Sequence, residues 1–206
     1  AAHDESGHSV SLNSAGNIVA IGAGGNDANG SGSGHTRIYE FNGSSWNQKG
    51  QDIDGEATDD FFGHSVSMSN DGNTVAIGAI GNDGNGSVSG HVRIYSWNGS
   101  NFQLKGSPVS GNIANEQFGS DTKISGDGNV IVVGAYNHSS QFNNQGCVRI
   151  YEWNGSNWIQ KGNNILGDYQ NYRLAKVDID FYGNRIVVGS LNYSQVHPAK
   201  VYNWDG

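Results

Sequence analysis

The 206-residue sequence has little cysteine, proline or charge. Its one cysteine, Cys147, excludes an intrachain disulfide framework, and we expect a half-buried small residue rather than a reactive thiol. Only 15% of residues are charged, and the net charge of −8 argues against nucleic acid or an anionic membrane as partner, since both bind basic faces. No apolar run is long enough for membrane insertion. Helical periodicity appears nowhere, which predicts an all-β chain.

Glycine, in contrast, is abundant, and much of it recurs at a fixed period. Similar segments begin at Gly7, Gly63 and Gly119, which are 56 residues apart. The same step separates three Arg-Ile-Tyr triplets, at 37–39, 93–95 and 149–151. Such a period indicates one supersecondary unit copied in tandem. We therefore predict a single repeat array with units at about residues 1–56, 57–112, 113–168 and an incomplete 169–206.

Four segments of the second unit have the character of short strands. Residues 63–69 alternate, so we expect two apolar side chains inward and three serines outward: Val66 and Met68, then Ser65, Ser67 and Ser69. Residues 74–79 are almost continuously apolar, as in a central buried strand. A long polar loop leads to residues 91–97, and an Asn-Gly hairpin turn connects these to residues 101–106.

Four antiparallel strands in a unit of about 50 residues is the size of a β-propeller blade. The fold class is therefore predicted as all-β, with about 3.7 blades. In the fourth copy Gly183 follows Gly128 by 55 residues, which suggests that one residue is lost before the first strand. We expect the array to be roughly half of a seven- or eight-bladed ring. The alternative is a fragment whose open sheet edges must associate with something else.

The repeated motifs resemble a known family. Phe62-Gly63-x-Ser65-Val66 and Val75-Ala76-Ile77-Gly78-Ala79 precede Gly90-x-Val92-Arg93-Ile94-Tyr95, and together they are similar to the FG-GAP repeat. The first copy has Ser6 instead of Phe, and the last has Arg173-Leu174 instead of Phe-Gly. The resemblance implies an extracellular or cell-surface propeller, of the kind found in integrin α-subunits, that serves adhesion or recognition and has no enzymatic activity.

Calcium is the one cofactor to consider. Integrin-type copies often carry an Asp-rich calcium loop in the first hairpin, but here residues 70–73 are too few to surround the ion. The long loops instead offer oxygen-bearing side chains at alternate positions: Asp27, Asn29 and Ser31, and in the next copy Asp83 and Asn85. The closing acid of a calcium loop is missing. Turn chemistry and a weak Ca²⁺ site both stay open.

Histidine and arginine also recur once per unit. His8 with His64, and His35 with His91, are expected on neighbouring blades rather than around one metal, which favours packing roles. A basic series on the third strand could grip an anion: Arg37, Arg93, Arg149 and Lys200. The alternative is cross-strand pairing with acids such as Glu40 and Glu152.

Aromatic residues stand at two fixed positions. One series starts the fourth strand and the other closes the third: Trp46, Phe102 and Trp158, then Phe41, Trp97, Trp153 and Trp204. Aromatic rings can stack on sugars, but repetition at one register favours packing between blades.

Specificity is expected where the copies disagree, in the loops at 135–146 and 191–199. The candidate ligand residues there are Asn137, Gln141, Asn143, Asn192 and Tyr193. Seven asparagines fit the N-glycosylation pattern: Asn29, Asn42, Asn85, Asn98, Asn137, Asn154 and Asn192. No catalytic motif stands out. We therefore predict a non-catalytic module with a protein or glycan partner at the cell surface; alternatives are a self-assembling block of a fibre or coat and a carbohydrate-binding propeller.

Overall fold

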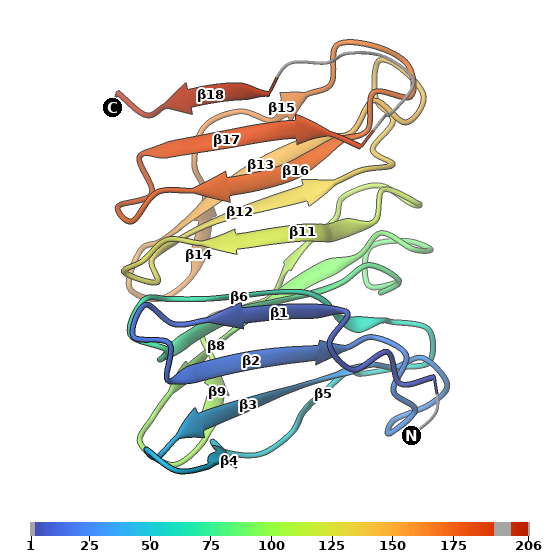
Figure 1. Cartoon of the computed structure of the whole chain (residues 1–206). Coiled ribbons are helices and arrows are strands. Elements are labelled where there is room, and N and C mark those ends of the chain that lie inside the picture. The colour runs from blue at the N-terminus through green and yellow to red at the C-terminus, as the bar shows by residue number, and fades with distance from the viewer. Residues whose placement is uncertain (1–2, 192–198, 206) are drawn as a thin grey trace.

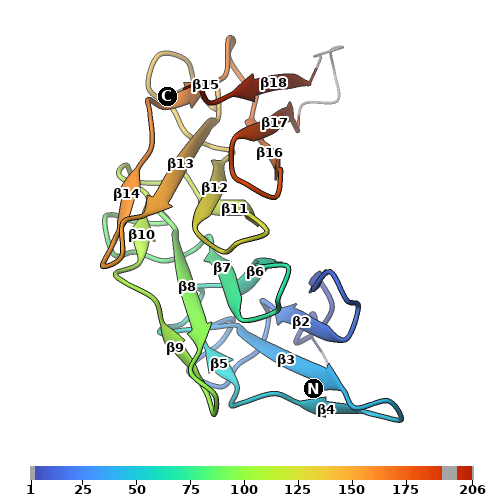
Figure 2. The same cartoon turned by 90° about the vertical axis from the view of Figure 1, so that its left-hand side faces the viewer.

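The computed structural model describes residues 3–191 and 199–205, which form four antiparallel β-sheets. The sheets follow one another from the N-terminal to the C-terminal end (Figure 1), and a side view shows them fanned out like blades (Figure 2). Each sheet lies within one of the four predicted repeat ranges. No described residue is helical, so this part of the chain has no helix that is long and apolar enough to cross a membrane.

Strands take the same place in every sheet. The first strands are β1 (Ser9–Leu12), β6 (Phe62–Met68), β11 (Phe118–Ile124) and β16 (Leu174–Ile179). The second are β2 (Ile18–Ala23), β7 (Thr74–Ala79), β12 (Val130–Ala135) and β17 (Arg185–Ser190). The third are β3 (His35–Phe41), β8 (His91–Trp97), β13 (Cys147–Trp153) and β18 (Lys200–Asn203). The fourth are β4 (Trp46–Gln48), β9 (Phe102–Leu104) and β14 (Trp158–Gln160).

A further two-residue strand pairs with the third strand of the first three sheets. These strands are β5 (Ile53–Asp54), β10 (Val109–Ser110) and β15 (Ile165–Leu166). They were not predicted, because two residues show no measurable periodicity. In the second sheet the predicted bounds of β7 and β8 are correct, β6 begins one residue early and β9 is shorter than residues 101–106.

The serines of β6 point toward the third sheet rather than toward solvent. Ser65 Oγ donates a hydrogen bond of 2.8 Å to the carbonyl of Gly119, and Ser67 Oγ accepts one of 3.1 Å from the amide of Ile124. Both serines are 6% exposed. The prediction that they face outward is wrong, because the neighbouring sheet covers the side of β6 that alternation alone assigns to water.

Close backbone contact between sheets explains the two glycine positions of the repeat. A bulge lies between Phe62 and Ser65, and Gly63 within it has a φ of +91°, which glycine adopts readily. Its carbonyl lies against Gly22 of the first sheet, where a β-carbon would overlap it. Gly78 meets the Gly119 carbonyl in the same way. The repeated glycines therefore set how closely consecutive sheets approach.

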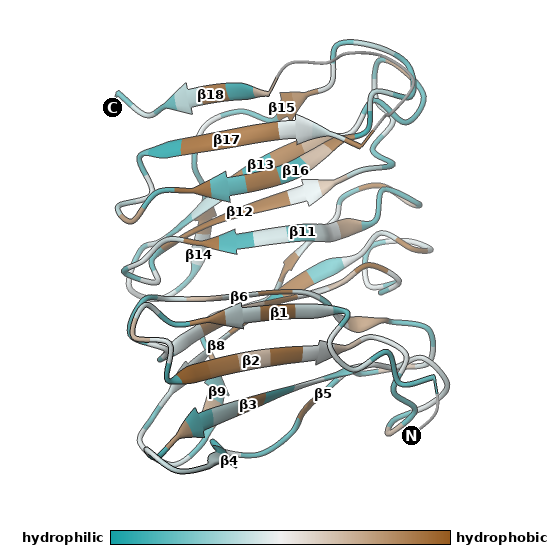
Figure 3. Ribbon diagram, in the orientation of Figure 1, coloured by the Kyte–Doolittle hydropathy of each residue, from teal (hydrophilic) through white to brown (hydrophobic). Residues whose placement is uncertain are grey.

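The hydrophobic core consists of three clusters, one between each pair of consecutive sheets. Between the first two sheets, Ile18 and Ile38 pack against Val66 and Ile77. The second strands supply much of the apolar surface, as the brown ribbons of β2, β12 and β17 show (Figure 3). Since fully burying one aliphatic side chain is worth about 1.5–3 kcal/mol, these clusters stabilise the stack of sheets.

The fourth sheet has three described strands and differs at its bulge. Leu174 bridges to Gly146 as Phe118 does to Gly90, so Leu174 is the counterpart of Phe118. The counterpart of Phe-Gly is thus Leu174-Ala175 and not Arg173-Leu174. The lost residue lies within the bulge, where Ala175 alone separates Leu174 from the resumed pairing. The prediction that it is lost before the strand is wrong, since spacing alone does not locate a deletion.

Candidate functional sites

The candidate cation ligands of the first long loop stabilise the loop itself. Asp27 Oδ1 accepts a hydrogen bond of 2.8 Å from the amide of Gly32. Asn29 Nδ2 donates one of 2.9 Å to the carbonyl of Gly55, and Ser31 is exposed. These contacts are those of a turn whose side chains satisfy local backbone groups.

The second long loop repeats this arrangement. Asp83 Oδ1 accepts from the amide of Val88 at 2.7 Å, and Asn85 Nδ2 donates to the carbonyl of Gly111 at 2.9 Å. Neither aspartate belongs to the group of three metal-capable side chains found among the described residues. A Ca²⁺ ion takes six to eight converging oxygens, and the loops do not fit that requirement.

The third long loop is organised around a buried side chain. Gln145 is fully buried, and its Oε1 accepts the backbone amide of Gln141 at 3.2 Å. Asn137 Nδ2 donates to Gln117 Oε1 at 2.5 Å, whereas Asn143 is exposed. The other two candidate ligand residues, Asn192 and Tyr193, lie outside the described residues.

The glycosylation candidates separate into two classes. Asn42, Asn98 and Asn154 are exposed, and each uses its Oδ1 to accept amides of its hairpin turn. Their Nδ2 atoms, which would carry a glycan, make no hydrogen bond within the described structure. In Asn29, Asn85 and Asn137 the same atom is already a hydrogen-bond donor, and Asn192 is not described. The hairpin sites stay predictions.

The histidines of neighbouring blades meet more closely than expected. The ring centroids of His8 and His64 lie 4.9 Å apart, so position on separate blades does not separate these side chains. Burial, together with the charges of His8 and Lys176, lowers the pKa of His64 to about 4. Burial also lowers the pKa of His91 to about 4, and its Nε2 is buried without a hydrogen-bond partner.

The basic series of the third strands does not form one anion site. Each member has its own acidic partner: Arg37 with Asp52 (2.8 Å), Arg93 with Glu56 (3.3 Å), Arg149 with Glu116 (2.8 Å) and Lys200 with Asp168 (2.6 Å). The suggested partners Glu40 and Glu152 instead pair with Lys49 and Lys161. The prediction that these basic residues pair with acids is thus confirmed, but the acids are not Glu40 and Glu152. The actual partners lie in loops, whose positions the strand pattern does not predict.

A buried polar network in the third sheet was not anticipated. Glu116 is fully buried and accepts from Arg149 Nη2 at 2.8 Å and from His138 Nδ1 at 2.6 Å. Burial raises the pKa of Glu116, but the hydrogen bonds of His138 and Arg149 outweigh it and hold that pKa below its ordinary value. Burial raises the pKa of the nearby Cys147 to about 12, so the thiol stays protonated at neutral pH. Cys147 is a core residue, fully rather than half buried.

Most of the repeated aromatic residues pack between blades. Phe102 and Trp158 are 2% and 7% exposed. Phe102 belongs to the core between the first two sheets, and Trp158 Nε1 donates a hydrogen bond of 2.8 Å to the Lys105 carbonyl of the second blade. Phe41, Trp46 and Trp204 are the exceptions, because they are 38%, 46% and 44% exposed. The predicted packing between blades is confirmed for the second and third blades. In the first blade the aromatic residues at these positions are exposed to solvent.

The first sheet presents an uncovered apolar face on the side away from the second sheet. Val10 and Leu12 are 62% and 58% exposed, whereas Val66 and Met68, which stand 56 residues later, are 5% and 6% exposed. A shallow depression on the same face is lined by Val19, Ile21, Tyr39 and Trp46. In the second sheet the equivalent residues Val66 and Met68 belong to the core against the first sheet.

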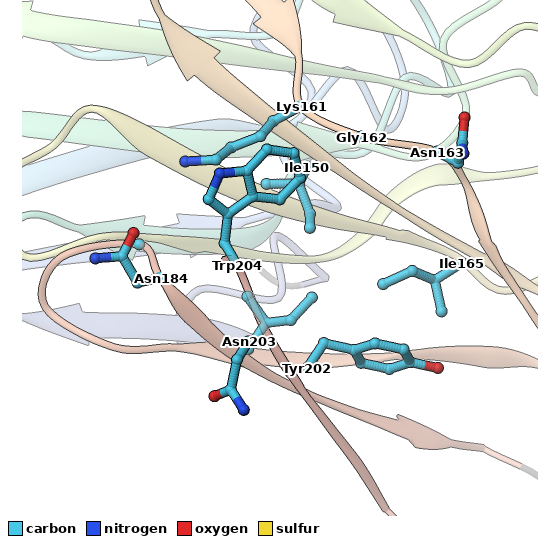
Figure 4. A pocket seen from close by; sticks show the side chains of 11 residues that line it. Ile150, Lys161, Gly162, Asn163, Ile165, Asn184, Tyr202, Asn203 and Trp204 are labelled. Carbon is cyan, nitrogen blue, oxygen red and sulfur yellow. The ribbon is translucent and has the colours of Figure 1, made fainter. Parts of the chain in front are cut away.

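A pocket opens at the other end of the array, beside Trp204 (Figure 4). Its volume is about 150 Å³, and its apolar walls are Ile150, Ile165, Ile186, Tyr202 and Trp204. Lys161 Nζ lies 5.0 Å from the Trp204 ring centre. One blade earlier, Lys105 of the second blade lies in the same way over Trp153 of the third sheet, and Trp158 from the fourth strand of that sheet fills the adjacent space. The pocket is therefore the place of a fourth-strand aromatic ring.

Comparison with family models identifies the repeat. The model that matches is described as the FG-GAP repeat, and it covers residues 52–95. This segment is an FG-GAP repeat. It runs from the end of the first sheet into β8 and so includes both glycine contacts of the second sheet. A comparison with curated protein sequences finds no match.

Solved structures share the propeller fold. Hydrazine synthase from Kuenenia stuttgartiensis superposes with a TM-score of 0.62 at 10% identity over 98% of this chain and 47% of its own. A putative 6-phosphogluconolactonase from Bacteroides uniformis gives 0.62 at 12%, over 95% and 50%. Sqt1 from Saccharomyces cerevisiae gives 0.60 at 13%, over 98% and 46%. The chain spans about half the length of these β-propellers, and identities this low establish the fold alone.

Proposed function

We propose that this FG-GAP propeller segment is a non-catalytic, extracellular recognition module that binds an extended polypeptide strand at β18. The observation that carries the proposal is the pocket beside Trp204. A strand added along β18 would pair with its backbone, and an aromatic side chain on that strand would enter the pocket as Trp158 does in the third sheet. Buried aromatic anchors of this kind dominate binding energies.

The chemistry of the buried groups supports a binding role. The Cys147 thiol is protonated at neutral pH, and the carboxylate of Glu116 is neutralised by Arg149. Groups held in this way stabilise the fold and are poor nucleophiles or bases. The extracellular setting rests on the FG-GAP repeat, which is typical of extracellular proteins.

The experiment is a titration of the protein with a labelled peptide that has the sequence of residues 154–162, followed by fluorescence anisotropy. We expect binding that weakens at least about tenfold when the peptide carries Trp158→Ala, because an aromatic anchor is worth ~1.4 kcal/mol or more. The protein variant Trp204→Ala should weaken binding similarly. Trp46→Ala, at the opposite end, is the matched control. Equal affinity for both peptides would refute the proposal.

Self-assembly is the second candidate, favoured by the uncovered faces at both ends. Val10 and Leu12 lie at one end, and Val201, 66% exposed, lies at the other. A head-to-tail contact between copies would cover both and would extend into a filament unless it closed into a ring. Light scattering tests this: Val10→Lys should reduce the mass of any oligomer, and a monomer at all concentrations excludes the idea.

A further inference from the structure

The tripeptide Asn-Gly-Ser occurs five times in the chain, in two structural settings. Three copies form the hairpin turns between third and fourth strands, at Asn42, Asn98 and Asn154. Two copies lie in the long loops between second and third strands, at Asn29 and Asn85. All five asparagines are exposed. Because the tripeptides are identical, a difference in their reactivity must come from what surrounds them in the fold.

An asparagine that precedes a glycine reacts with its own backbone. The glycine amide nitrogen attacks the side-chain carbon Cγ, and glycine has no side chain that shields this nitrogen. The N–Cγ bond forms and the amide proton passes to solvent, while the Cγ–Nδ2 bond breaks and the amino group takes a proton from solvent and leaves as ammonia. Water then opens the succinimide ring at either carbonyl and gives aspartate or isoaspartate. Water is the only co-reactant.

In the hairpins, the oxygen that becomes negative during this attack already accepts several hydrogen bonds. Asn42 Oδ1 accepts from the amides of Ser44 and Ser45, both at 3.0 Å, and from Ser44 Oγ at 2.9 Å. Asn98 and Asn154 repeat this pattern with donors at 2.9 to 3.1 Å. Donors aimed at an oxygen on which negative charge develops stabilise the transition state.

The nucleophile and the leaving group of the hairpin copies are both free. The amide of Gly43 donates no hydrogen bond within the described residues, and the same is true of its counterparts Gly99 and Gly155. The Nδ2 atoms of the three hairpin asparagines donate none there either. Water therefore reaches both the nitrogen that attacks and the nitrogen that leaves.

In the loop copies the same atoms are engaged differently. Asn29 Nδ2 donates to the carbonyl of Gly55 at 2.9 Å, and the amide of Gly30 donates to the carbonyl of Asp27 at 3.3 Å. The second loop repeats both bonds, at 2.9 and 3.1 Å. Neither loop Oδ1 accepts a hydrogen bond in the described structure. Both nitrogens must lose a partner before the reaction proceeds, and no donor stabilises the oxygen.

We propose that Asn42, Asn98 and Asn154 are sites at which the folded protein converts asparagine to aspartate and isoaspartate, whereas the two loop asparagines are protected. Each conversion adds one negative charge to an exposed hairpin. Asn154 lines the same hollow as Trp204, so its conversion places a carboxylate beside the edge where we propose that a strand binds. The charge of the hairpins thus increases irreversibly with the age of the protein.

The test follows all five asparagines in the whole chain, produced in bacteria so that Nδ2 carries no glycan. Folded protein is kept at neutral pH and physiological temperature, and peptide mapping by mass spectrometry measures the replacement of NH₂ by OH at each site. We expect the hairpin sites to convert at least about tenfold faster than the loop sites. In the matched control, the chain unfolded in urea, all five should convert at similar rates. Isoaspartate among the products verifies the cyclic intermediate.

A variant tests the hydrogen-bond donors of the hairpin. Ser44→Ala removes the Oγ donor and should slow conversion at Asn42 about three- to tenfold, which is the effect of one hydrogen bond. Asn98 and Asn154 of the same chain are internal references, and Ser31→Ala, in the first loop, is the control substitution. Circular dichroism verifies that each variant is folded. Equal rates at hairpin and loop sites of the folded protein overturn the proposal, and so does an unchanged rate at Asn42 in Ser44→Ala.

Discussion

The first and second sheets carry nearly the same residues and differ in what covers them. Val10 and Leu12 of the first sheet are mostly exposed, and their counterparts Val66 and Met68 are buried. The second sheet lies between two neighbours, whereas one face of the first sheet has none in the structure. The repeat therefore specifies a surface that fits a neighbouring blade, and the neighbour decides whether that surface becomes core.

The same comparison explains where function is to be sought. In the second and third sheets the equivalent positions are used for packing, so they are unavailable to a partner. At the two ends of the described array the repeat leaves an apolar face and a pocket beside Trp204 accessible. Substitutions at matched positions, 56 residues apart, can separate the contribution of the residue from that of its neighbour.

The largest difference is expected for one isoleucine pair. Ile77→Ala should lower the free energy of unfolding by about 2–5 kcal/mol, because it leaves a cavity in the first interface core. Ile21→Ala removes the equivalent side chain from the half-buried face of the first sheet and should cost less than about 1 kcal/mol. Urea denaturation measures both. Equal losses would mean that the open face is covered in solution.

A glycine pair gives the next largest effect. A β-carbon at Gly78 would overlap the Gly119 carbonyl, so Gly78→Ala should cost about 3 kcal/mol as the two sheets are forced apart. Gly189 of the fourth sheet is the control, since a β-carbon there meets only the Lys176 side chain at 3.7 Å. Thermal unfolding of Gly189→Ala should stay close to wild type. If Gly78→Ala is equally harmless, the contact does not set the spacing.

Acid should act on the second sheet through His91. Its folded pKa of about 4 lies below the ordinary 6.5, so its neutral form stabilises the fold. That contribution is complete above pH 6.5 and is lost as pH falls toward 4. His91→Cys copies the third sheet and should reduce the loss of stability between pH 7 and pH 5 by about 2 kcal/mol. Denaturation curves at the two pH values test this; an unchanged difference would assign the acid sensitivity elsewhere.

The smallest expected effect is that of calcium. Asp27 and Asp83 already accept backbone amides, so Ca²⁺ or its chelator should leave the melting temperature within about 1 °C. Scanning calorimetry in millimolar calcium and in chelator gives the comparison. A rise in melting temperature with calcium would show that these loops rearrange around an ion. Asp83→Asn should then abolish that rise.

Much of the blade could be predicted because its signals are local. The apolar run 74–79 and the Asn-Gly turn of the second blade fix strand and hairpin through short-range sterics and solvation. Similar reasoning failed for Ser65 and Ser67, since period-two alternation does not reveal whether a second sheet covers the polar side.

The candidate sites were harder to predict for the same reason. Asp27 and Asp83 were candidate ligands because the residue spacing of their loops is similar to that of a calcium loop. Their carboxylates instead accept hydrogen bonds from backbone amides of the turns. His35 and Asp54 are 19 positions apart and become neighbours only through the pairing of β5, a strand of two residues.

By itself, the sequence determined the 56-residue unit, its first four strands and its hairpins, because each follows from the backbone preferences of neighbouring residues. Tertiary structure decided which faces are buried, which acids pair with Arg37, Arg93 and Arg149, and which side chains gather at the open ends. The physical reason is that burial and charge pairing depend on groups far away in the chain. The same residues therefore form core in one copy and accessible surface in another.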